Sequence, residues 1–266
     1  MISTVSPKVL TAALAALACA CAGCHRKADA SDQPIHVAAA SSLTFAFKEA
    51  AAQYEQETGR KVLVSFGASG LLSKQLREGA PFDLFAAANQ SFVDDAIHSG
   101  VCDGATEQLY AVGRIVMWTP DPKKAPAAIA DLADAARFSK IAIANPEHAP
   151  YGKAAREALQ KAGVWQAVQG RIVYGENIEQ TLQFAQSGNA DVAIVALSLA
   201  KVSGGGSTLV DDALHTPIRQ MMVACKHGAG EDAGKAFEAF LGGSEGRAIL
   251  RKYGFYLPGE APTSSR

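Results

Sequence analysis

Four short segments of this sequence place serine, threonine, asparagine or glycine between an apolar run and the start of a helical pattern. In chain order they are residues 40–44, 66–70, 145–152 and 174–178. Each is a predicted strand-to-helix junction, where the first helical turn leaves backbone N–H groups without intrahelical partners. A helix start carries roughly half a positive charge and therefore favours an anion. Four converging junctions would hold an anion without any charged side chain.

Serine hydroxyls at the first two junctions add side-chain donors to these N–H groups. Ser41 and Ser42 follow the first apolar run, and Ser69 follows the second. A fully deprotonated oxyanion accepts from every such donor, whereas an acid that carries a proton needs a nearby acceptor. A serine that merely caps its helix is the simpler interpretation of Ser42 or Ser69 taken alone. The prediction of an oxyanion site therefore rests on the four junctions together.

Short apolar strands alternate with helices along the chain, a pattern typical of a parallel α/β architecture. Strands are predicted at 35–40, 61–66, 82–87, 114–119, 140–144, 168–174 and 190–196, and an extended segment at 217–225. Helices are predicted at 44–57, 69–77, 92–98, 127–136, 151–162 and 179–186, with a helix pair at 231–253. A flexible turn explains the glycines at 204–206.

The pattern divides the chain into two lobes. Pro120 and Pro122 lie near a plausible boundary, and the segment 217–225 returns to the first lobe. We expect a discontinuous first lobe at 35–113 and 219–258, a second lobe at 114–218, and a tail at 259–266. Two crossings between the lobes would leave the ligand site in the cleft.

The N-terminus is typical of an export signal. Lys8 precedes an apolar run at 9–22, which is too short for the ~20 residues of a membrane span. Cys24, after Ala22 and Gly23, resembles a bacterial lipoprotein box, although Cys21 occupies the position where leucine is usual. We predict a signal peptide at 1–24, lipidation of Cys24 and a polar tether at 25–34. That tether argues against the alternative, a buried N-terminal helix.

Composition and the remaining reactive residues narrow the function further. With a net charge of −1, the chain lacks the excess of basic residues that is typical of nucleic-acid-binding proteins. The six histidines show no paired spacing, so a site for a free metal cation is not expected. Asp83 is interpreted as a structural cap or loop anchor. Cys102 and Cys225 could pair in an oxidising compartment, but the sequence does not show their proximity, and we favour two separate buried thiols.

At its junctions the chain resembles the periplasmic molybdate-binding proteins of ABC importers, a branch of the type II periplasmic binding proteins. The resemblance covers 35–257 and is carried by 38–44 (AAASSLT), 79–85 (GAPFDLF), 145–152 (NPEHAPYG), 175–178 (GENI) and 251–255 (RKYGF). It implies a two-lobed α/β fold, in which each lobe is a mainly parallel sheet flanked by helices and the ligand lies in the interlobe cleft.

The resemblance also implies a set of neutral oxyanion ligands: Ser41, Ser42, Ser69, Tyr151 and Ile178. In the family, the positions of Ser42 and Ser69 give hydroxyls, and those of Tyr151 and Ile178 give backbone N–H groups. Some members add a tyrosine hydroxyl just after the strand matching 190–195, where this chain has Ala196. Ser41 or the Tyr151 hydroxyl could replace that donor, and the preferred anion stays open.

The leading hypothesis is an exported, monomeric receptor without a cofactor. It would be periplasmic or at the cell surface, with a lipid anchor as its only membrane attachment, and would deliver molybdate or tungstate to an ABC permease. A receptor for sulfate, thiosulfate or another oxyanion is the alternative within the class. A secreted hydrolase with Ser42 or Ser69 as nucleophile would need a base, and His148 is the only histidine at a junction. A surface lipoprotein that has lost ligand binding is a third alternative.

Overall fold

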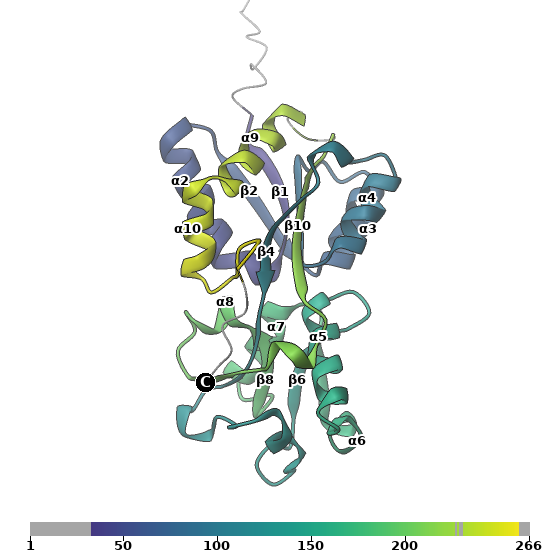
Figure 1. Cartoon of the computed structure of the whole chain (residues 1–266), viewed down its shortest axis with the longest axis vertical. Coiled ribbons are helices and arrows are strands. Elements are labelled where there is room, and N and C mark those ends of the chain that lie inside the picture. Colours follow the sequence, from purple (N-terminus) through teal and green to yellow (C-terminus); the bar gives the residue numbers. More distant parts are fainter. Residues whose placement is uncertain (1–32, 227, 229–230, 261–266) are drawn as a thin grey trace, which may run out of the picture.

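Two sheets organise the part of the chain that the computed structural model describes, residues 33–226, 228 and 231–260 (Figure 1). One sheet has the strand order β2-β1-β3-β10-β4 and the other the order β7-β6-β8-β5-β9. Each is mixed, and helices flank both. The predicted two-lobed α/β fold is confirmed, and below, each lobe is named by its sheet.

The first sheet has a parallel core formed by β1 (Ile35–Ala40), β2 (Val62–Gly67) and β3 (Leu84–Ala87). β10 (Ile218–Ala224) joins β3 and β4 (Gln108–Gly113) in antiparallel fashion. Its helices are α2 (Thr44–Thr58), α3 (Ser69–Arg77), α4 (Gln90–His98), α9 (Glu231–Gly242) and α10 (Ser244–Lys252).

Alternate residues of β1 bury against opposite helix layers, as the two-residue period of a strand requires. Val37 and Ala39 belong to one core cluster with Phe47 of α2. Ala38 belongs to a second cluster with Leu72 of α3. Figure 1 accordingly shows α2, α9 and α10 on one side of this sheet and α3 and α4 on the other.

The second sheet repeats this plan with β6 (Ile141–Ala144), β7 (Ile172–Gly175) and β8 (Val192–Ala196) in parallel. β5 (Ile115–Thr119) pairs antiparallel with both β8 and β9 (Gly206–Leu209). The helices of this lobe are α5 (Pro150–Lys161), α6 (Trp165–Val168), α7 (Ile178–Gln186) and α8 (Leu197–Ala200).

The chain passes between the sheets twice. β4 leads through Arg114 directly into β5, and β9 is followed by the 3₁₀ turn η7 (Asp212–Leu214) and then by β10. The predicted extended segment at 217–225 therefore does return to the first sheet. We propose the lobe boundaries as predicted, 35–113 with 219–258 and 114–218.

The helix predicted at 127–136 is wrong. This segment contains only the 3₁₀ helix η5 (Ile129–Ala133). The Asp131 carboxylate accepts from the N–H groups of Ala127 and Ala128, and the Asp134 carboxylate accepts from that of Ala136. Such short acidic side chains compete with the helix for backbone donors. The strand predicted at 168–174 begins later, at Ile172, because a 3₁₀ turn, η6 (Gln169–Arg171), precedes it.

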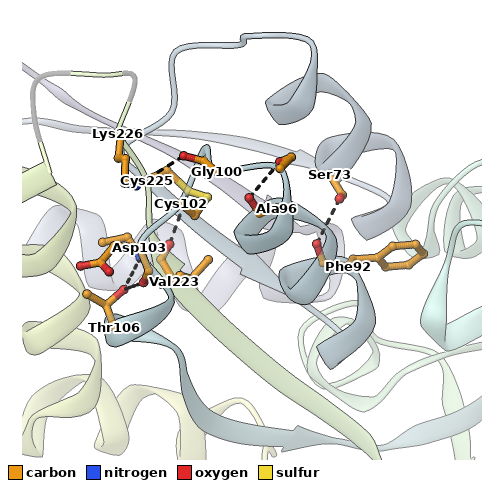
Figure 2. Close-up of a disulfide and its surroundings, with 12 residues drawn as sticks. Ser73, Phe92, Ala96, Gly100, Cys102, Asp103, Thr106, Val223, Cys225 and Lys226 are labelled. Carbon is orange, nitrogen blue, oxygen red and sulfur yellow. Dashed lines mark hydrogen bonds between the residues drawn. A yellow bond between two sulfur atoms is a disulfide. The ribbon is translucent and has the colours of Figure 1, made fainter.

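The expectation of two separate thiols is also wrong, because Cys102 and Cys225 form a disulfide (Figure 2). The two residues face each other in an antiparallel bridge between the segment before β4 and the end of β10. Asp103 N–H donates to the Ala224 carbonyl at 2.8 Å, and Ala224 N–H donates to Thr106 Oγ1 at 2.8 Å. Backbone pairing of two distant segments thus brings the sulfurs together, which no local pattern reveals.

The signal peptide at 1–24 with Cys24, most of the tether at 25–34 and most of the tail at 259–266 lie outside the described residues. Within the described ones, no helix combines the length and the apolar character needed to cross a bilayer.

Candidate anion-binding site

A small cavity lies between the lobes, where the carboxyl ends of the parallel strands meet the following helices. Its lining comprises Ala40, Ser41, Ser42, Gly67, Ala68, Ser69, Ala88, Ala149, Pro150, Tyr151 and Ile178. The five residues predicted from the sequence therefore all reach one cavity. The described residues of its lining include no acidic, basic or histidine side chain, so any anion held here would meet only neutral donors.

The helix starts around the cavity retain free backbone donors. α3 begins at Ser69 and α5 at Pro150, and neither helix has a side-chain cap. In α7 the Asn177 side chain accepts from the N–H groups of Glu179 and Gln180, the second and third helical residues. The N–H group of Ile178, the first helical residue, is not used by this cap. Ser69 lies inside α3, and Ser42 lies inside the 3₁₀ turn η2 (Ser41–Leu43). The simpler interpretation of these serines as helix caps therefore does not hold.

Both serine hydroxyls have a proton to give. Ser69 Oγ accepts from Ala88 N–H at 3.0 Å, which leaves its own proton unused. Ser42 Oγ is buried beside the Tyr151 phenol and makes no hydrogen bond of normal geometry in the described part of the chain. A buried polar atom without a partner costs free energy. An acceptor bound in the cavity would remove that cost.

Tyr151 brings a third hydroxyl to the cavity wall. Its side chain is buried, and its phenol oxygen accepts from Gln220 Nε2 at 3.0 Å. Burial raises the pKa of Tyr151 well above its ordinary value, while the neighbouring Ser42 and Gln220 side chains oppose that rise. The phenol is therefore protonated at physiological pH. Ala196 ends β8 opposite Ile115 and is not part of the cavity lining.

Besides the Gln220–Tyr151 bond, three further hydrogen bonds among the described residues connect the lobes beside the cavity. Ser198 Oγ donates to the Ser42 carbonyl at 2.6 Å, and Gly70 N–H donates to the His148 carbonyl at 3.0 Å. Thr44 Oγ1 lies 3.2 Å from Glu179 Oε2 and donates to it. The junctions of one lobe are thus fixed by the other, as expected of a cleft closed around its site.

Close backbone approaches explain two glycines at the site. A Cβ on Gly70 would lie 2.8 Å from the Phe92 ring and 3.0 Å from His148 Cβ, so a side chain would push the lobes apart. A Cβ on Gly152 would lie 1.9 Å from the Ala144 carbonyl oxygen, where α5 starts against the end of β6. Glycine at 152 lets the donors of α5 sit directly beside the strand end.

The arrangement a hydrolase would need is not formed in the described part of the chain. The His148 ring bonds through Nε2 to the Glu176 carbonyl at 3.0 Å, rather than to a serine. Asp83 does not line the cavity, and its carboxylate accepts from His36 N–H at 2.7 Å, which fits the predicted loop anchor. Among the described residues, no group of three or more histidine, cysteine or acidic side chains could hold a metal ion.

Two α/β lobes that enclose a donor-lined cavity define a solute-binding protein of the two-lobed type. The chain belongs to the bacterial extracellular solute-binding protein family, whose family model matches residues 35–256. This match confirms the class of protein to which the junction motifs point.

Characterised relatives narrow the resemblance. The molybdate-binding protein ModA of Rhodobacter capsulatus is 38% identical over 219 residues, which are 82% of this chain and 86% of that protein. The ModA of Azotobacter vinelandii is 36% identical over 227 residues, 84% of this chain and 90% of that protein. The solved structure of the Azotobacter vinelandii periplasmic molybdate-binding protein superposes with a TM-score of 0.79 at 28% identity, covering 84% of this chain and 99% of that chain.

The sequence did not point to Ser198 or Gln220, which support the site from outside the cavity lining. Ser198 lies in the short helix α8, and Gln220 lies in the middle of β10. Gln220 is not at a strand-to-helix junction, and Ser198 is at the junction of β8 with α8, where the sequence did not predict a helix. Each reaches its partner only through the packing of one lobe on the other.

Proposed function

We propose that this chain is an extracytoplasmic receptor that captures molybdate or tungstate and delivers it to an ABC permease. A cavity whose walls offer hydroxyl and N–H donors, with no charged side chain among them, carries this proposal. The similarity to molybdate-binding proteins over more than four-fifths of the chain supports it. The proposed role is binding and delivery rather than catalysis, and it requires no resident cofactor.

The proposed ligand set is Ser41, Ser42, Ser69, Tyr151 and Ile178. In this scheme Ser42 and Ser69 give hydroxyl protons, and Tyr151 and Ile178 give backbone N–H groups. Ser41 and the Tyr151 phenol supply further hydroxyls. A tetrahedral dianion accepts from all of them and has no proton that would need an acceptor. The Tyr151 phenol, from the junction after the neighbouring strand β6, then compensates for the absence of a tyrosine at Ala196.

Calorimetric titration of the purified protein with molybdate, tungstate, sulfate and phosphate tests the proposal. Molybdate and tungstate should bind, and at a thousand times Kd either anion should stabilise the fold by about 4 kcal/mol in a thermal melt. Sulfate binding in preference to molybdate would assign the site to another oxyanion. An absence of heat and of any melting shift with all four anions at millimolar concentration would overturn the proposal.

We also propose that the receptor is periplasmic or on the cell surface, held there through lipidated Cys24. The export signal and the lipoprotein box in the sequence support this location. Wild-type protein should fractionate with membranes, whereas Cys24→Ser should release it or leave the precursor uncut. A soluble wild-type protein whose N-terminus lies beyond Cys24 would contradict the anchor.

A further inference from the structure

An irregularity in the strand pairing lies beside the crossing between the lobes. β10 pairs with β4 so that Gln220 faces Ala111 and Met221 faces Leu109, which leaves Tyr110 as an extra residue. A bulge of this kind turns side chains out of the regular alternation and is common next to binding sites. Gln220 lies next to this bulge and is fully buried.

The Gln220 amide is directed at the cleft. Its Nε2 donates to the phenol oxygen of Tyr151 at 3.0 Å, although the two residues belong to different sheets. Gly113, at the end of β4, makes room for this pair, because a Cβ there would lie 2.1 Å from the phenol oxygen and 3.0 Å from the amide nitrogen. A glycine, a bulge and a buried amide thus converge on one hydroxyl of the cavity wall.

This contact determines what the phenol can offer a ligand. A hydroxyl that accepts a hydrogen bond from a fixed N–H group keeps its proton for another partner. Ser69 is held in the same way by Ala88 N–H at 3.0 Å. Gln220 Oε1 has no hydrogen-bond partner among the described residues. Within that part of the chain, the amide group therefore makes a single hydrogen bond, to the Tyr151 phenol.

Resting on the proposed function, we propose that Gln220 is a specificity-determining positioning residue. The Tyr151 hydroxyl oxygen accepts a hydrogen bond from the Gln220 amide. This contact directs the hydroxyl's own proton toward the cavity. The cavity then presents donors only, and an oxyanion that carries a proton, such as hydrogen phosphate, finds no acceptor for it. Gln220 would act on the ligand only through Tyr151.

Affinities of the full-length mature protein for molybdate and phosphate, measured by calorimetry at pH 7, test this role. Gln220→Met removes the donor at similar volume, and we expect molybdate to bind about tenfold more weakly. The affinity for phosphate should fall less or should rise, because the freed phenol can turn and accept the proton of hydrogen phosphate. The molybdate-to-phosphate preference should therefore narrow by about tenfold.

Gln220→Glu provides a second variant of almost unchanged shape. Its carboxylate would accept the phenol proton and turn the oxygen lone pairs toward the cavity, which should narrow the preference further than Gln220→Met does. The negative charge itself weakens the binding of both anions. The readout is therefore the ratio of the molybdate and phosphate affinities rather than either affinity alone. This variant keeps the test available even if Gln220→Met folds poorly.

Two comparisons separate positioning from simple packing. In a Tyr151→Phe background, Gln220→Met should leave the molybdate-to-phosphate ratio unchanged, because the hydroxyl through which it acts is gone. Gln108→Met makes the same chemical change in β4, where the side chain bonds to Glu238 Oε1 at 3.2 Å, and should not alter the ratio. An unaltered ratio in both Gln220 variants, or an equal change without the phenol, would overturn the proposal. Wild-type protein that binds no anion would refute the proposed function instead.

Discussion

The two lobes build the same cavity from different chemical parts. The first lobe contributes the side-chain hydroxyls of Ser42 and Ser69, and Ser69 is oriented by an N–H group of its own lobe. The second lobe contributes the backbone N–H of Ile178, and its one hydroxyl, on Tyr151, is oriented by Gln220 of the first sheet. Residue identity should therefore matter most in the first lobe, and backbone geometry in the second.

The lobes also differ in how they are stabilised. Within the described residues, the disulfide Cys102–Cys225 and the buried acid Glu238 both belong to the first lobe. The second lobe relies on its apolar core and on close backbone packing, as at Gly152. Perturbations of redox state should therefore act mainly through the first lobe, and so should the pH dependence that comes from Glu238.

The largest expected effect sharpens this contrast in stability. Replacing both cysteines, as Cys102→Ala with Cys225→Ala, should lower the free energy of unfolding by about 2–5 kcal/mol. Molybdate affinity should stay within about twofold, because the bond does not reach the cavity. Urea unfolding and calorimetry on the same preparations measure the two quantities. An unchanged unfolding midpoint would show that backbone pairing alone holds these segments.

Serine substitutions test the first lobe as the source of side-chain donors. Ser42→Ala and Ser69→Ala should each weaken molybdate binding by about 10- to 100-fold. Ser69→Ala should also cost about 1–3 kcal/mol of stability, because Ala88 N–H loses its acceptor. Ser42→Ala should cost less, because the Ser42 hydroxyl makes no hydrogen bond of normal geometry among the described residues. Calorimetry and urea unfolding separate these effects.

Ser73→Ala is the matched control for the serine substitutions. Ser73 lies one turn further along α3, is buried and donates to the Phe92 carbonyl at 3.0 Å, outside the cavity lining. The Ser73→Ala variant should lose stability and keep its affinity for molybdate. Intact affinity in the Ser42→Ala, Ser69→Ala double variant would mean that the site is misplaced.

A proline can test the second lobe as a source of backbone donors. Ile178 is the first residue of α7, a position that tolerates proline, and Asn177 before it has the extended backbone that proline requires. Ile178→Pro should weaken molybdate binding by about tenfold, since it removes the N–H while keeping an apolar side chain at this position. Ile178→Val keeps the N–H and should bind as the wild type does. Equal affinity of the two variants would remove Ile178 from the ligand set.

The smallest expected effect concerns pH and the first lobe. Burial raises the pKa of Glu238 from 4.5 to about 7, and hydrogen bonds from Gln108 and Thr106 only partly oppose it. Because the folded state holds this proton more tightly, its stabilising contribution is complete below pH 4.5 and is lost as the pH rises toward about 7. Unfolding free energies should therefore fall by about 1–2 kcal/mol between pH 5 and 8. Glu238→Gln should flatten that slope, and a slope that persists in the variant would assign it to other groups.

The parts of the fold that the sequence predicted are those with strong local signals. Buried runs such as β1 and β8, and the junctions that follow them, are recognisable from apolar composition and small polar residues. β4 and β9 were not predicted, since β9 begins at a glycine that reads as part of a flexible turn. At 129–133 a 3₁₀ helix forms because the Asp131 carboxylate competes with the helix for backbone N–H groups. The apolar periodicity used to predict a helix takes no account of such side-chain hydrogen bonds.

The candidate site divides in the same way. Composition marks the four junctions, and the resemblance to molybdate-binding proteins singles out Ser41, Ser42, Ser69, Tyr151 and Ile178 within them. Gln220 and Ser198 reach the site through contacts between the lobes, with partners 69 and 156 residues away in the chain. The pairing of Cys102 with Cys225 spans 123 residues and follows from strand register, which is a property of the assembled sheet.

The disulfide has a mechanical consequence. It joins the segment before β4 to the end of β10, so the whole second lobe lies inside one covalent loop. Tension applied between the two ends of the chain would pass through the sulfur bond and bypass residues 103–224. A stretched molecule could lengthen only outside the loop, and a single cut of the backbone within it would leave one covalently connected molecule. A pulling experiment should record the missing contour length, and reductant should restore it.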